Sequence, residues 1–194
     1  MKLPLTKDEG RILDFDIENM PITYYAPDYP TAFVTAIAWA FTDEPKNIEV
    51  RVVEDIRDDE AYDQMLVDFW DAYDQADIVT GHYIRKHDLP IINGALIDQG
   101  FSIGLSPVMA SDTKMDLVRF SAIPKNQEYL EAILGTKTQK LNMTQADWRK
   151  ANRFTPEGIA KTRKRVHSDV QGHMQTRAEL IERGLLHPPR LWRP

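Results

Sequence analysis

The chain of 194 residues contains no cysteine. Disulfide bonds, thiol catalysis and cysteine-ligated zinc sites are therefore excluded. Long apolar runs are also missing: nothing approaches the roughly 20 apolar residues that a membrane-spanning helix needs, and the opening MKLPLTKDEGR has no apolar signal core. We therefore expect a cytoplasmic protein with no membrane partner.

The composition is that of a folded globular chain. Hydrophobic residues make up 42% and charged residues 28%, which argues against disorder. The length suffices for one domain with a real core, and there is no internal repeat or low-complexity linker. We expect residues 1–194 to form a single domain.

Charge is unevenly distributed along the chain. Residues 137–194 hold 13 Lys or Arg against 5 Asp or Glu, whereas residues 1–136 hold 11 against 25. An acidic body therefore carries a basic C-terminal third, which suggests a local anion-binding surface. The alternative is a solvated helix face with no ligand.

Hydrophobic periodicity predicts three strands first, and then strands that alternate with helices. This order predicts an α/β fold with a mixed five-stranded sheet flanked by helices. The short TDEP link, residues 42–45, predicts a hairpin between the second and third strands. The predicted strands are 11–18, 31–41, 47–55, 76–82 and 108–113, and the predicted helices are 59–75, 88–100, 114–120, 126–134, 144–151 and 156–184.

The first strand, within RILDFDIENMP (11–21), alternates apolar residues with the acids Asp14, Asp16 and Glu18. Side chains two apart on a strand share a face, roughly 6.5–7 Å apart. Burying such carboxylates bare is costly, and a hard divalent cation such as Mg²⁺ removes the penalty. Asp16 and Glu18, at the strand's end, are candidate metal ligands, and for Asp14 we favour a structural role. The alternative is that all three acids face solvent at a sheet edge.

Two further motifs follow in order. GHYIRKHDLP (81–90) places Asp88 at the start of a helix, and RVHSDVQGHMQTRAEL (165–180) places Asp169 in a basic helical turn. Together with FDIE (15–18), these motifs resemble the DEDD 3′→5′ exonucleases, the DnaQ-like proofreading enzymes of the ribonuclease-H-like fold. The segments SDTKMDLVR (111–119) and MTQADWRKAN (143–152) look like connecting regions of the branch related to family B polymerase exonuclease domains.

The resemblance covers about residues 10–185. It implies that Asp16, Glu18, Asp88 and Asp169 are catalytic and bind two Mg²⁺ or Mn²⁺ ions. The implied reaction is two-metal hydrolysis of DNA at single-stranded or frayed 3′ ends, in replication, proofreading or repair. The size suggests a free-standing, bacteriophage-type member, which would act in the host cytoplasm, with a replicative polymerase as a candidate partner. Two kinds of alternative stay open: a catalytically degenerate module that binds DNA or a partner, and an endonuclease or an RNA-specific exonuclease on the same fold.

The sequence departs from this family just before its last acid. The family has a Tyr four residues before that Asp, or a His five before, and here these positions hold Arg165 and Lys164. Arg cannot act as a base at neutral pH. Candidate water-activating substitutes are His173, one turn after Asp169 on the same helix face, and His167, about 200° around the helix. For His173 the alternative is an ordinary exposed histidine.

Basic residues near the last motif are candidate contacts to the nucleic-acid backbone. The tyrosines Tyr24, Tyr25 and Tyr29 are candidates for stacking on bases, with loop packing as the alternative. The basic candidates are Arg149, Lys150, Arg153, Lys161, Arg163, Lys164 and Arg165.

Overall fold

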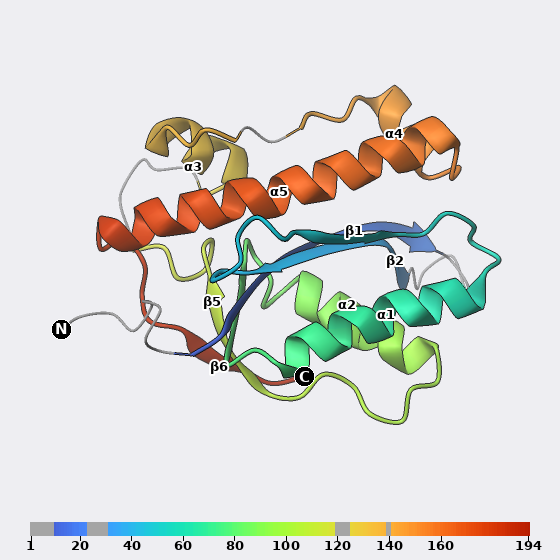
Figure 1. The fold of residues 1–194 in the computed structure, drawn as a ribbon, viewed down its shortest axis with the longest axis horizontal. Coiled ribbons are helices and arrows are strands. Elements are labelled where there is room, and N and C mark those ends of the chain that lie inside the picture. The colour runs from blue at the N-terminus through green and yellow to red at the C-terminus, as the bar shows by residue number, and fades with distance from the viewer. Residues whose placement is uncertain (1–9, 23–30, 119–124, 139–140) are drawn as a thin grey trace.

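The computed structural model describes residues 10–22, 31–118, 125–138 and 141–194. The three candidate stacking tyrosines, Tyr24, Tyr25 and Tyr29, lie outside these residues. Figure 1 shows a central sheet with one long helix, α5, across one face and the helices α1 and α2 on the other. Two shorter helices, α3 and α4, pack on α5. No helix within the described residues is long and apolar enough to cross a membrane.

The strands are β1 (Ile12–Ile22), β2 (Thr31–Phe41), β3 (Glu49–Val52), β4 (Ile78–Gly81), β5 (Val108–Asp112) and β6 (Arg190–Trp192). The helices are α1 (Asp59–Asp74), α2 (Asp88–Asp98), α3 (Gln127–Leu134), α4 (Gln145–Ala151) and α5 (Pro156–Glu182).

The sheet is mixed, in the order β3-β2-β1-β4-β5-β6. The predicted hairpin is confirmed, because β2 pairs antiparallel with β3, while β1, β4 and β5 are parallel to one another. The expected number of five strands is wrong: β6 adds a sixth, antiparallel to β5. It has only three residues and follows two prolines, so it is too short to show strand alternation, and it lies beyond the 10–185 core implied by the resemblance.

The two faces of β1 differ in chemistry. Leu13, Phe15 and Ile17 are buried in the core cluster that includes α1 and α2 side chains. The three acids alternate with them and face α5. Opposite the acids, β2 places alanines in register, and these pack against Val166 and Val170 of α5. The register pairs are Asp14 with Ala40, Asp16 with Ala38, and Glu18 with Ala36. Small neighbours thus leave room for carboxylates beneath the helix.

The predicted helix at 114–120 is wrong over its described part. Residues 114–118 form turns and a bridge from Leu117 to Leu186, and 119–120 lie outside the described residues. The buried carboxylate of Asp112 accepts the backbone N–H groups of Lys114 and Met115, each at 3.0 Å. Asp116 in turn accepts the N–H of Asp112 at 2.9 Å. These side chains hold the backbone in a closed loop instead of a helix.

Candidate metal centre

Three of the four predicted metal ligands converge in space. Asp16 and Glu18 come from β1 and Asp169 from α5, and each offers a carboxylate oxygen within 4.8 Å of the others. Asp169 is only 1% exposed, whereas the other two are partly accessible. An all-oxygen, anionic donor set of this kind suits a hard divalent cation. The residues present therefore fit a metal ion.

Asp88, the fourth predicted ligand, lies beside this cluster but is not in the group of described carboxylates that could share one ion. It begins α2 and is 3% exposed. Its Oδ1 accepts the N–H of Ile17, the residue between Asp16 and Glu18, at 3.3 Å. Its Oδ2 lies 3.3 Å from His87 Nδ1, and this hydrogen bond raises the pKa of His87 against the opposing effect of burial.

The loop that presents Asp88 is held in place by Asp112, which was not among the predicted site residues. Asp112 accepts the backbone N–H of Tyr83 at 3.0 Å and that of Arg85 at 3.1 Å. Tyr83 has φ 72°, the left-handed region that Asn and Gly adopt most easily. The sequence signal for this role of Asp112 was its position at the end of a predicted strand. In the structure Asp112, the last residue of β5, pairs with Gly81, the last residue of β4.

Arg165 lies directly on the carboxylate cluster. Its Nε is 2.5 Å from Glu18 Oε1 and 3.6 Å from Asp169 Oδ2. Its Nη1 donates to the carbonyl of Leu141 at 2.5 Å, and the guanidinium lies 5.3 Å from the ring centre of Trp148. Burial by itself lowers the pKa of Arg165, but the nearby carboxylates more than offset it, so the pKa is raised. The cluster therefore has a fixed positive neighbour.

His173 is not an exposed histidine: it is 2% exposed, so that expectation is wrong. Its Nδ1–H donates to the carboxylate of Asp14 at 2.8–2.9 Å, and its Nε2 lies 3.0 Å from the hydroxyl of Thr113. Both ring nitrogens are engaged, which favours a structural role over water activation. Asp14 is fully buried, in line with the structural role favoured for it. His167 is partly buried, and its role in activating water stays a prediction.

The predicted nucleic-acid contacts divide into two groups. Four of them already pair with acids. Three are exposed and make no ion pair to a described carboxylate: Arg149, Arg153 and Lys164. The four pairs are Lys150 with Glu157, Lys161 with Asp147, Arg163 with Glu54, and Arg165 with Glu18 and Asp169.

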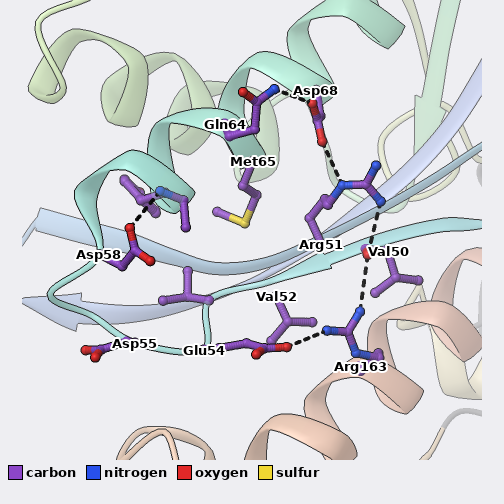
Figure 2. Close-up of a pocket in the computed structure, with 13 residues that line it drawn as sticks. Val50, Arg51, Val52, Glu54, Asp55, Asp58, Gln64, Met65, Asp68 and Arg163 are labelled. Carbon is purple, nitrogen blue, oxygen red and sulfur yellow. Dashed lines mark hydrogen bonds and ion pairs between the residues drawn. The ribbon is translucent and has the colours of Figure 1, made fainter.

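A pocket of about 560 Å³ lies elsewhere, between the edge strand β3 and α1 (Figure 2). Its two arginines are occupied: Arg51 pairs with Asp68 at 2.7 Å, and Arg163 of α5 donates to the carbonyl of Val50 at 3.3 Å. None of the four predicted metal ligands lines this pocket. It is therefore separate from the carboxylate cluster.

Comparison with known proteins gives a likeness in structure. No family model and no curated protein sequence matches this chain. Among solved structures, the family B DNA polymerase from the hyperthermophilic archaeon Pyrobaculum calidifontis is similar, with a TM-score of 0.61 and 17% sequence identity. The match covers 89% of this chain and 24% of the polymerase chain, so this chain spans about a quarter of its length. At this identity the likeness concerns the fold, and it confirms the expected α/β class.

Proposed function

We propose that this protein is a metal-dependent 3′→5′ exonuclease that hydrolyses DNA at single-stranded or frayed 3′ ends. The observation that carries the proposal is the convergence of Asp16, Glu18 and Asp169 from two elements far apart in the sequence. The fold likeness to a family B polymerase supports it, because the motifs resemble the exonuclease domains of that branch. Fold alone does not determine activity, so the site must carry the argument.

In this proposal the four acids bind and orient two Mg²⁺ or Mn²⁺ ions. Asp16, Glu18 and Asp169 offer carboxylate oxygens that lie close to one another. The carboxylate of Asp88 accepts the N–H of Ile17 next to this group. Bound divalent cations would lower the pKa of an attacking water and stabilise the leaving oxygen. Arg149, Arg153 and Lys164 are exposed and so available to contact the nucleic-acid backbone.

The biological setting is part of the same proposal. A bacteriophage-type enzyme in the host cytoplasm would act in replication, proofreading or repair, alongside a replicative polymerase. The resemblance of the connecting segments to the family B branch supports DNA over RNA as the substrate. A product ladder from labelled DNA and RNA of the same sequence would separate these two substrates.

A second candidate function is a degenerate exonuclease fold that holds nucleic acid without cutting it. Arg165 favours this candidate, because a cation lies against Glu18 and Asp169 at the position where the family has its water-orienting Tyr. A guanidinium cannot take a proton from water at neutral pH.

The test uses 5′-labelled single-stranded and 3′-recessed DNA with Mg²⁺ or Mn²⁺. We expect a ladder that shortens from the 3′ end and is abolished by EDTA, Asp16→Asn or Asp169→Asn. Glu179→Gln removes a carboxylate from an outer position of the same helix and should leave the ladder unchanged. Binding without cleavage in either metal would instead establish the degenerate module.

A further inference from the structure

Arg165 differs from the other paired basic side chains of the C-terminal third in the acids that it contacts. Two of its partners, Glu18 and Asp169, belong to the candidate metal centre. Lys150, Lys161 and Arg163 pair with acids outside that centre. A positive charge is thus placed against two of the three carboxylates that a divalent ion would use.

The position of this guanidinium is well defined. Asp169 lies four residues further along α5, where helix geometry brings the two side chains onto one face. The carbonyl of Leu141 accepts a second N–H at 2.5 Å, and Trp148 provides an aromatic ring at 5.3 Å. The Arg165 side chain is only 13% exposed. These contacts fix the charge at the cluster and limit its screening by water.

A guanidinium and a divalent cation at the same carboxylates compete in two ways. They repel each other, and both interact with the carboxylates of Glu18 and Asp169. In a partly buried site at separations of about 4 Å, such an interaction changes ion affinity by about tenfold or more. Removing the guanidinium should therefore strengthen metal binding.

We propose that Arg165 acts as a counter-cation of the carboxylate cluster. Its guanidinium lowers the affinity of the cluster for divalent ions until a nucleic-acid phosphate draws the guanidinium away. This inference rests on the proposed function, because that function assigns the cluster to metal. The planar guanidinium matches phosphate oxygens as well as carboxylates. Metal and nucleic acid would then strengthen each other's binding, and by linkage the coupling is the same in both directions.

The first experiment measures Mn²⁺ binding by electron paramagnetic resonance, without nucleic acid. Arg165→Met keeps the aliphatic stem and removes the charge, and we expect it to bind Mn²⁺ about tenfold or more tightly than the wild type. Arg183→Met is the matched control. It removes the same charge from the end of the same helix, where Arg183 pairs with Glu179 at 2.8 Å, and it should leave Mn²⁺ affinity unchanged.

A second neutral variant, Arg165→Gln, keeps a hydrogen-bond donor near Glu18 and guards against a folding defect in Arg165→Met. Tighter Mn²⁺ binding by either folded variant supports the proposal. Unchanged or weaker Mn²⁺ binding by both Arg165 variants overturns the proposal. In that case the metal centre itself is still supported if the wild type binds Mn²⁺ and Asp169→Asn does not. Absence of Mn²⁺ binding in the wild type and in both Arg165 variants overturns the proposal together with the metal-dependent function.

The phosphate step has its own measurement. A phosphorothioate oligonucleotide, which resists hydrolysis, should raise the Mn²⁺ affinity of the wild type. The same oligonucleotide should raise the Mn²⁺ affinity of Arg165→Met by a smaller factor, because that variant has no guanidinium to draw away. An equal increase in both proteins would overturn the phosphate step.

Discussion

Asp14 and His173 form a buried pair that joins β1 to α5. Asp14 is fully buried, and the His173 N–H donates to its carboxylate at 2.8–2.9 Å. We expect His173→Leu to lower the free energy of unfolding by about 3 kcal/mol, because it leaves a buried acceptor without its partner. Urea unfolding would measure this loss. His167→Leu, on the same helix but only partly buried, should change the unfolding midpoint little, and equal midpoints for both variants would contradict the expectation.

The sequence revealed one half of this pair and missed the other. Alternation in β1 placed Asp14 on the face of Asp16 and Glu18, and a structural role was favoured for it. His173 lies 159 residues further along the chain, so no local pattern linked the two. Helix periodicity put His173 on the face of Asp169, but the packing of that face against β1 follows only from the assembled fold.

At the scale of the elements, the corner where α4 meets α5 depends on Gly158. A Cβ at Gly158 would lie 2.4 Å from the backbone carbonyl carbon and oxygen of Lys150. We expect Gly158→Ala to destabilise the protein by about 1–3 kcal/mol, because backbone atoms must move apart. This loss should exceed the gain in helix propensity. Thermal or urea unfolding would measure the change.

Gly94, inside α2, is the matched control for this substitution. A Cβ there would meet nothing within 4 Å, so Gly94→Ala should instead stabilise the protein by about 0.5–1 kcal/mol. The two alanine substitutions thus have opposite expected signs. A stabilising Gly158→Ala would show that the α4–α5 corner is looser than the structure describes.

The same corner carries a pH-dependent ion pair. Lys161 of α5 holds the pKa of Asp147 in α4 well below its ordinary value of 3.8, with help from the hydroxyl and N–H of Thr144. A pKa that is lower in the folded state means that the pair stabilises the fold above about pH 3.8 and loses that contribution as the pH falls towards the folded pKa. We expect Lys161→Met to raise the pKa of Asp147, as measured by NMR titration of its carboxyl carbon. An Asp147 pKa that is the same in Lys161→Met and in the wild type would contradict this assignment.

Elements with strong periodicity were predictable, and those shaped by distant contacts were not. The helix α5 was predicted at 156–184, and in the structure Thr155 caps its first turn directly before Pro156. The sequence of 114–118 on its own predicts a helix, but the carboxylate of Asp112 accepts the backbone N–H groups of Lys114 and Met115. The strand β6 is too short to show alternation, so only its pairing with β5 defines it.

At the scale of the whole molecule, some of the basic residues of the C-terminal third form ion pairs with acids of the rest of the chain. Arg163 pairs with Glu54 after β3, and Arg165 pairs with Glu18 on β1, so these ion pairs join α5 to the acidic body. The basic third is therefore less of a uniform anion-binding surface than its composition suggests. Arg149, Arg153 and Lys164 are exposed and have no described acid partner, so they are the candidates for contact with an external anion.

These three side chains should set the salt dependence of nucleic-acid binding. Each phosphate contact on a single strand contributes about 0.7 to the slope of log affinity against log salt concentration. Replacing Arg149, Arg153 and Lys164 together by Gln should therefore weaken binding of a single-stranded oligonucleotide and lower the magnitude of that slope by about 2. Fluorescence anisotropy in metal-free buffer at several salt concentrations would measure both quantities.

The control for this triple variant removes the same number of charges from other surfaces. Lys46, Arg57 and Arg183 are exposed cations outside the candidate contacts, and replacing them by Gln keeps the net charge equal to that of the first variant. Net charge alone affects long-range attraction, whereas direct phosphate contacts determine how many counterions are released. Equal slopes for the two triple variants would therefore place the nucleic-acid contacts elsewhere. A lower slope in the first variant alone would locate them on α4, the turn that follows it and the N-terminal half of α5.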